Sequence, residues 1–169
     1  MKMNKKVLIS TIVLLTLSMM VLSPVKAITK ETYTMHMELE LKDPGIQWVS
    51  EEGILHMRDF HWMGTVEGTL GTETYEGTYE SWVSVSINPL TGEGTVSEKF
   101  KITITTGPSQ GTLSGSSRCK LAMPQFSGTL VATHGTGDFE GAKMTGSFKG
   151  YHPDLTHIIA DAWGIIIRT

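Results

Sequence analysis

The stretch His134-Gly-Thr-Gly-Asp-Phe-Glu-Gly-Ala-Lys-Met-Thr-Gly-Ser-Phe-Lys-Gly150 decides the fold of this chain. Its glycines stand between alternating polar and apolar residues, and Gly-Thr pairs recur from residue 64 to residue 136. Glycine inside a strand weakens the strand unless the sheet bends sharply there or another backbone approaches closely. Repeated bends favour a closed, strongly coiled barrel over a flat sandwich.

The rest of the chain alternates between apolar and polar residues with a period of two. Residues 35–42, 79–87 and 99–104 each place apolar side chains on one face and polar ones on the other, which indicates half-buried strands. Turn sequences such as Asn88-Pro-Leu-Thr-Gly92 separate them. Eight or nine strands and no helical period after residue 27 predict an all-β protein, an antiparallel barrel of about eight strands.

The N-terminal segment indicates export. Three lysines precede an apolar run, residues 7–22, and Ser-Pro-Val-Lys-Ala27 ends it with small residues at the cleavage positions. This pattern predicts a signal peptide over residues 1–27 and a single barrel domain over residues 28–169, secreted or extracytoplasmic. The alternative is an uncleaved N-terminal anchor. After cleavage no segment is long and apolar enough to hold the chain in a membrane.

Charge excludes one class of partner. Removal of residues 1–27 takes away four lysines and no acidic residue, so the net charge would move from −3 to −7. Such a chain repels phosphate backbones, and we expect no nucleic acid partner. Cys119 is the only cysteine, so an internal disulfide is impossible, and burial as a small apolar residue is the favoured interpretation.

The segment Gly135-Thr-Gly-Asp-Phe-Glu-Gly-Ala142 resembles the glycine-rich motif of the allene oxide cyclase-like barrel superfamily, which includes the dirigent proteins. Met144 departs from the glycine expected there. The resemblance implies an eight-stranded antiparallel barrel with a central cavity, often assembled as a homotrimer. It assigns a structural role to the motif residues and gives no catalytic residue. These motif residues are Gly135, Gly137, Phe139, Gly141 and Ala142.

Candidate catalytic or metal-binding groups are sparse. His56 and His61 form the densest ionisable cluster with the residues between them. Residues five apart on a regular strand face opposite sides, so these two histidines are not expected to share a metal unless a turn intervenes. His152 and His157 flank a proline turn and are interpreted as loop residues. No metal and no cofactor is predicted.

Three functions remain open. The first is binding of a small, largely apolar ligand in a central cavity, with Trp82, Phe100 and Phe139 as candidate wall residues. The second is a cyclase- or dirigent-type enzyme that orients a reactive substrate. The third is a structural or interaction protein whose barrel is filled by its own side chains. An open cavity with an ionisable residue at its base would favour the enzyme, and a filled interior would count against the first two. For Trp82, packing on a covered outer surface or at a subunit contact is the equal alternative.

Overall fold

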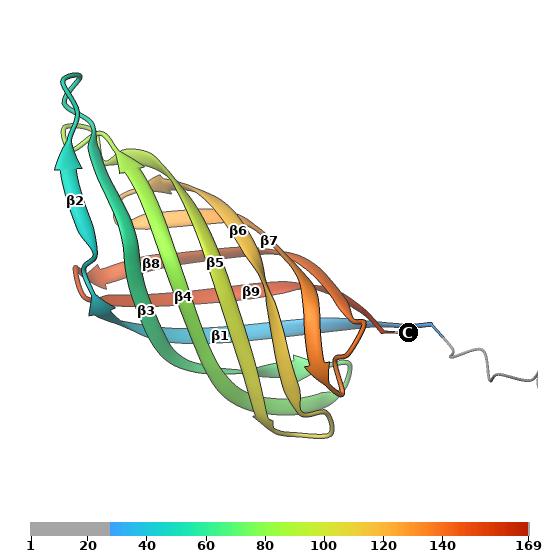
Figure 1. Ribbon diagram of the computed structural model, residues 1–169. Coiled ribbons are helices and arrows are strands. Elements are labelled where there is room, and N and C mark those ends of the chain that lie inside the picture. Colours follow the sequence, from blue (N-terminus) through green and yellow to red (C-terminus); the bar gives the residue numbers. More distant parts are fainter. Residues whose placement is uncertain (1–27, 169) are drawn as a thin grey trace, which may run out of the picture.

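A computed structural model describes residues 28–168, and the predicted signal peptide, residues 1–27, lies outside them. This part of the chain consists of nine β-strands joined by short turns, with no helix long and apolar enough to span a membrane. The all-β prediction is confirmed (Figure 1). The strands are β1 Thr29–Asp43, β2 Ile46–Val49, β3 Leu55–Leu70, β4 Glu73–Ile87, β5 Glu93–Thr106, β6 Gly111–Ala122, β7 Gln125–Gly137, β8 Lys143–Asp154 and β9 His157–Arg168.

Eight of these strands close into an antiparallel barrel. Sequential neighbours pair from β3 to β9, β9 pairs with β1, and β1 pairs with β3 to close the ring. The short strand β2 pairs only with the start of β3 and projects at one end of the barrel (Figure 1). Closure leaves no barrel strand with a free edge, which removes the usual site of edge-to-edge aggregation.

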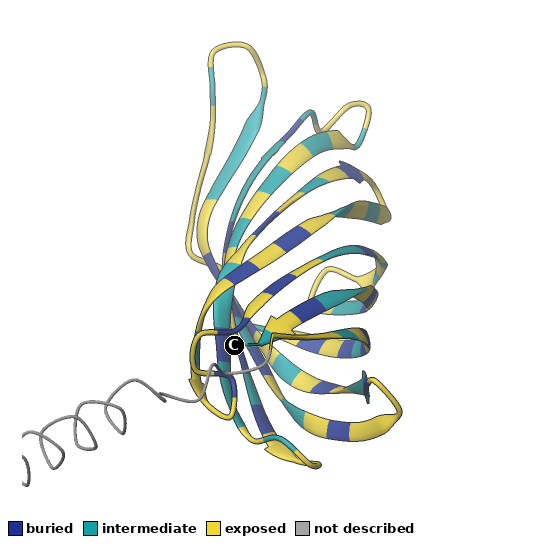
Figure 2. Ribbon diagram, turned by 90° about the vertical axis from the view of Figure 1, so that its right-hand side faces the viewer, coloured by how far each residue is buried: buried dark blue, intermediate teal, exposed yellow. Residues whose placement is uncertain are grey.

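The period-two pattern and the glycines both follow from this closure. Buried and exposed residues alternate along each strand (Figure 2), because one face points into the barrel and the other into solvent. The strand glycines mark close approaches between neighbouring backbones. A Cβ on Gly64 would lie 1.9 Å from the carbonyl oxygen of Glu38, and one on Gly115 would lie 1.9 Å from that of Val131. The prediction that these glycines permit tight curvature is therefore consistent with the structure.

The interior divides into two halves along the barrel axis. At the end that holds the start of β1, the end of β9 and the β7–β8 turn, large side chains pack the barrel interior, and Val66, Ile102 and Ile166 are each at most 2% exposed. At the other end, which carries β2 and the β4–β5, β6–β7 and β8–β9 turns, the side chains leave an open cavity. The barrel is therefore neither fully filled nor fully hollow.

Candidate functional site: the barrel cavity

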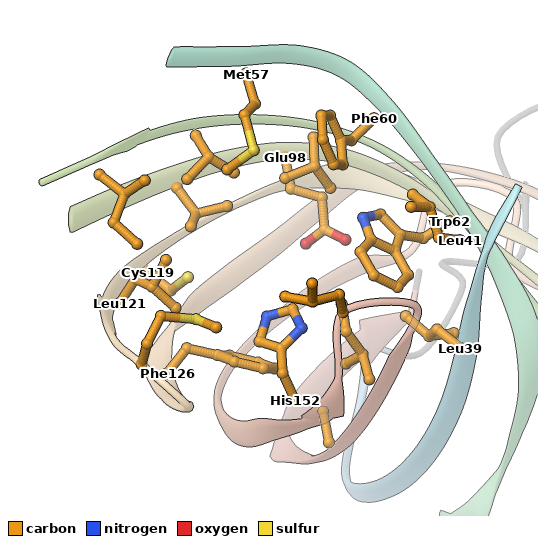
Figure 3. A pocket seen from close by; sticks show the side chains of 18 of the residues that line it. Leu39, Leu41, Met57, Phe60, Trp62, Glu98, Cys119, Leu121, Phe126 and His152 are labelled. Atoms are coloured by element: carbon orange, nitrogen blue, oxygen red, sulfur yellow. The ribbon is translucent and has the colours of Figure 1, made fainter. Parts of the chain in front are cut away.

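The open half of the barrel contains a cavity of about 530 Å³ with mostly apolar walls. Inward-facing side chains from all eight barrel strands line it, several of which are seen in Figure 3. The turns at the open end add Pro44, Pro89, Met123 and Leu155 to the lining. A few polar groups interrupt these apolar walls, as in sites for small molecules. The polar lining groups include Tyr79, Glu98, Ser117, Cys119 and His152.

Glu98 is the chemically distinctive group of the cavity. Its carboxylate points into the cavity from β5 (Figure 3) and accepts hydrogen bonds from the hydroxyls of Tyr79, at 3.1 Å, and Ser117, at 2.5 Å. Although protein atoms surround Glu98, the cavity keeps part of its surface accessible. Burial raises its pKa, and the hydroxyls of Ser117, Ser81 and Tyr79, which favour the charged form, offset that effect only in part.

The Ser81 hydroxyl lies beside this group without making a well-aligned hydrogen bond. Ser81 is fully buried, and its oxygen has no partner of good geometry among the described residues. A carboxyl group with a raised pKa and three hydroxyls around it can act as a hydrogen-bond donor when protonated. The base of this mostly apolar cavity thus offers a polar anchoring point.

His152 faces the cavity from the opposite wall (Figure 3). It belongs to strand β8 and not to a loop, so the sequence interpretation of His152 is wrong. Its ring contacts two aromatic rings edge-on, Trp62 at a centroid distance of 5.9 Å and Phe126 at 5.5 Å. Burial lowers its pKa, which favours the neutral imidazole. His157, the other histidine near this turn, begins β9 and contacts Asp154 at the surface.

Cys119 lies on the inner face of β6 and lines the same cavity. It is half-buried, and burial followed by the nearby Glu98 raises the pKa of its thiol to about 12. The thiol is therefore protonated at neutral pH and a poor nucleophile. This placement agrees with the expectation of a small apolar residue in the wall.

None of the three predicted wall residues lines the cavity. Trp82 lies on the outer face of β4, is 43% exposed and stacks on His61 at 5.1 Å. Phe100 is buried in the packed half, where it stacks on Tyr79 just beyond Glu98. Phe139 lies at the far, closed end of the barrel. The prediction fails for Trp82 because the polar face of its strand is the solvent face.

The predicted structural motif covers the last residues of β7, from Gly135 to Gly137, and the turn that leads from there to β8. Phe139 is 1% exposed beneath the Arg168 guanidinium, and Ala142 is fully buried. A Cβ on Gly135 would lie 1.9 Å from the carbonyl oxygen of Phe139, and Gly137 and Gly141 have positive φ angles of 64° and 77°. The motif therefore closes the packed end of the barrel.

A bulge in β3 changes the expected geometry of His56 and His61. The register shifts between Met57 and Phe60, and Asp59 has a φ of 60°. The extra residue places both histidines on the outer face, where His56 stacks on Trp48 and His61 on Trp82. On a regular strand the two histidines would face opposite sides, but on the bulged strand β3 they share the outer face. Within residues 28–168, no group of three or more potential ligands is arranged to hold a metal.

Sequence reasoning missed Glu98, Ser117 and His152. For Glu98 the sequence did contain a signal. Phe100, Ile102 and Ile104 alternate along one face of β5, and the same period of two places Glu98 on that apolar face. A carboxylate on the apolar face of a strand is rare without a function or a partner. For Ser117 and His152, the sequence offers no comparable signal.

The fold and the cavity define an eight-stranded antiparallel barrel with one open end. No protein-family model and no curated protein matches the chain. The solved structures similar to it include two dirigent proteins. The pterocarpan synthase dirigent protein PsPTS1 shows 13% identity and a TM-score of 0.46 over 84% of this chain and 95% of that one. GePTS1, another pterocarpan synthase dirigent protein, shows 14% identity and a TM-score of 0.39 over 85% and 92%.

Both structures belong to a group that the sequence resemblance names. The architecture implied by that resemblance, an eight-stranded antiparallel barrel, is the architecture of this chain. The likeness concerns the fold, and the chemistry of the site is that of the residues described above.

Proposed function

We propose that this protein binds and orients a small, largely apolar molecule in the open half of its barrel. The observation that carries the proposal is the cavity of about 530 Å³, with apolar walls and the single Glu98 cluster at its base. Burial of an apolar ligand supplies affinity at about 25 cal/mol per Å² of surface removed from water. One polar group at the base then fixes the orientation of the ligand.

The chemistry of the base specifies the polar end of the ligand. Glu98 already accepts hydrogen bonds from Tyr79 and Ser117, and its raised pKa favours a protonated carboxyl group. A protonated carboxyl group donates one hydrogen bond, so a carbonyl, ether or hydroxyl oxygen on the ligand fits this position. A ligand anion is disfavoured, because the cavity lining contains no lysine or arginine that could pair with it in a poorly solvated site.

Native mass spectrometry of the purified protein, compared with its mass after denaturation, tests this proposal. We expect extra mass that denaturation releases. A Cys119→Phe variant places a large ring in the cavity wall and should lose that mass. A Val131→Phe variant adds the same ring on the exposed face of β7 and should keep it. An unliganded mass for all three proteins, with no uptake of the neutral apolar probe N-phenyl-1-naphthylamine, would contradict binding.

A second candidate is a substrate-orienting enzyme in which Glu98 moves a proton. The position of an ionisable group at the base of an open cavity favours it, as the sequence analysis anticipated. A carboxyl group with a raised pKa in an apolar site is suited to general acid catalysis near neutral pH. Tyr79 and Ser117 would hold the carboxyl group in place while the walls hold the substrate.

The released ligand allows the two candidates to be separated. If the protein is an enzyme, incubation should convert the ligand or a precursor from the source cells into a product of changed chromatographic position. Glu98→Gln should abolish the conversion and still retain the ligand. Unchanged ligand with both proteins would exclude the enzyme and leave the binding function.

Export and assembly as a homotrimer stay predictions. Export rests on residues 1–27, and the homotrimer on the family resemblance. N-terminal sequencing of the secreted protein locates the cleavage site. The native mass spectrum measures the number of subunits at the same time.

A further inference from the structure

The outer wall of the barrel over β5 to β8 carries a concentration of positive charge. Six exposed basic side chains lie on the solvent face of these strands, where the acidic residues within the strands are Glu93, at the start of β5, and Asp154, at the end of β8, which contacts His157. The acidic residues of the outer face gather instead on β1, β3, β4 and β9. The basic residues are Lys99, Lys101, Arg118, Lys120, Lys143 and Lys149, and together they define the basic wall.

The cations of the basic wall have no acidic partners. Within residues 28–168 none of the six forms an ion pair. Lys101 and Lys149 lie opposite Glu80 and Asp161 on the neighbouring strands. Those two carboxylates contact histidines instead, Glu80 with His61 at 3.0 Å and Asp161 with His36 at 2.8 Å. In a chain with more acidic than basic residues, six clustered cations without ion-pair partners are available for an external anion.

A shallow groove crosses the basic wall, and short hydroxyl side chains line it around the cations. The strand register aligns Arg118 with Thr129, Ser147 and Trp163 in one row. The next row aligns hydroxyls from β4, β5 and β7 with Lys120 and Lys149. Each step between strands is about 4.8 Å, so the first row extends over about 14 Å and the second over about 19 Å. The Trp163 ring, 46% exposed, lies at one end of the groove with Lys149 above it.

We propose that this groove binds an extended anionic polysaccharide, a chain of sugar rings bearing sulfate, phosphate or carboxylate groups. The cations complement its charge, the serine and threonine hydroxyls exchange hydrogen bonds with its hydroxyls, and the Trp163 face packs against the apolar side of a sugar ring. A single-stranded nucleic acid fits less well, because stacking of successive bases needs several aromatic platforms and the groove offers one. The groove lies on the outer side of the barrel wall, and Val96, Cys119 and Phe148 of its lining also line the cavity.

Binding to dextran sulfate, with neutral dextran of the same length as the comparison, tests the proposal. We expect dextran sulfate to bind with an affinity that falls steeply as salt is added, and neutral dextran not to bind. The variant Arg118→Gln/Lys120→Gln/Lys149→Gln removes three cations of the groove. Its affinity should fall about 100-fold, since each cation near an anionic surface contributes about fivefold. The control Lys30→Gln/Lys42→Gln/Arg58→Gln removes the same charge outside the basic wall and should change the affinity less than about twofold.

Trp163 separates recognition of sugar from simple charge attraction. Trp163→Ala should weaken dextran sulfate binding and leave the binding of inorganic polyphosphate, which has no sugar ring, unchanged. Equal loss in the two triple variants, or tighter binding of polyuridylate RNA than of dextran sulfate, would overturn the proposal. The proposal would also be overturned if the basic-wall variant kept dextran sulfate binding but no longer self-associated in sedimentation experiments. The basic wall would then be a contact between copies of the chain. Melting temperatures of all variants show whether the barrel remains folded.

Discussion

Glu98 makes the stability of the folded protein depend on pH. Because its pKa is raised in the folded state, the folded chain holds this proton more tightly than the unfolded chain does. The free energy of unfolding is therefore highest below the ordinary glutamate pKa and falls as pH rises through the folded-state pKa. Glu98→Gln removes the buried charge at nearly constant size. We expect its melting temperature to exceed that of the wild type at pH 8, with the difference shrinking below about pH 4.

Calorimetric melting across this pH range measures the effect. Glu93→Gln, on the exposed face of the same strand, is the matched control and should show no such trend. A Glu98→Gln variant that melts below the wild type at pH 8 would contradict the raised pKa. It would mean that the hydrogen bonds from Tyr79 and Ser117 outweigh burial.

His152 should produce the opposite dependence. Its pKa is lowered, mainly by burial, so the folded chain disfavours the protonated ring. Stability is then lost as pH falls below the ordinary histidine pKa of about 6.5. We expect His152→Gln to lose less stability than the wild type between pH 7 and pH 5, as measured by urea midpoints. The control variant His134→Gln, at an exposed position on β7, should lose as much stability as the wild type. If His152→Gln lost as much stability as the wild type between pH 7 and pH 5, His152 would not be the cause of the loss.

At the level of single residues, the sequence predicts the face of a side chain better than its surroundings. The period of two places Glu98 on the inner face of β5 once the pattern is followed far enough. Its partners Tyr79 and Ser117 come from β4 and β6 and meet it only through the strand register, which the sequence does not specify. Trp82 shows a different error. An aromatic residue on a polar strand face suggests a cavity wall in the sequence, but in the structure this ring lies on the outer face and stacks on His61.

Among the elements, the β7–β8 turn acts as the closure of the packed end. Phe139 enters the core from this turn. The backbone N–H of Asp138 donates to the carbonyl oxygen of Gln110 in the β5–β6 connection, and the Asp138 carboxylate accepts a hydrogen bond from the backbone N–H of Gln110. Phe139→Ala leaves a cavity where packing is dense, so we expect a loss of about 3–5 kcal/mol in the free energy of unfolding. Ligand binding in the open half should not change under conditions in which the variant is folded.

Urea denaturation together with a binding titration checks this prediction. Leu90→Ala, at a turn of the open end where the side chain is 93% exposed, is a control with an expected change below about 0.5 kcal/mol. If Phe139→Ala weakened ligand binding as much as it weakened stability, the two halves of the barrel would be coupled more closely than their separate packing indicates.

The elements themselves were largely predictable, because turn residues and a period of two are local signals. The bulge in β3 was not, since it depends on how β3 fits against β4. Nor was the projecting strand β2, whose pairing with the start of β3 extends the sheet beyond the barrel. These two irregular features lie beside the cavity mouth, where Gln47 and Met57 line the opening.

For the whole molecule, the sequence predicts a barrel but not which half of it is open. That division depends on the sum of side-chain volumes at each level of the barrel, and the register decides which side chains share a level. Tyr79 and Phe100, stacked across β4 and β5, separate the packed half from the cavity. The same chain therefore combines a structural half with a half available to a ligand.

This division predicts unequal protection of backbone amides from hydrogen exchange. Residues with few buried apolar contacts open locally at lower free energy than those in a packed core. In β1 and β3, amides at the packed end, such as those of Met35 and Val66, should exchange at the rate of global unfolding. The amide of Met57, beside the bulge and the cavity, should exchange much faster, although it belongs to the same strand as Val66. Exchange followed by NMR under native conditions measures this gradient, and uniform protection along β3 would show that the whole barrel opens as one unit.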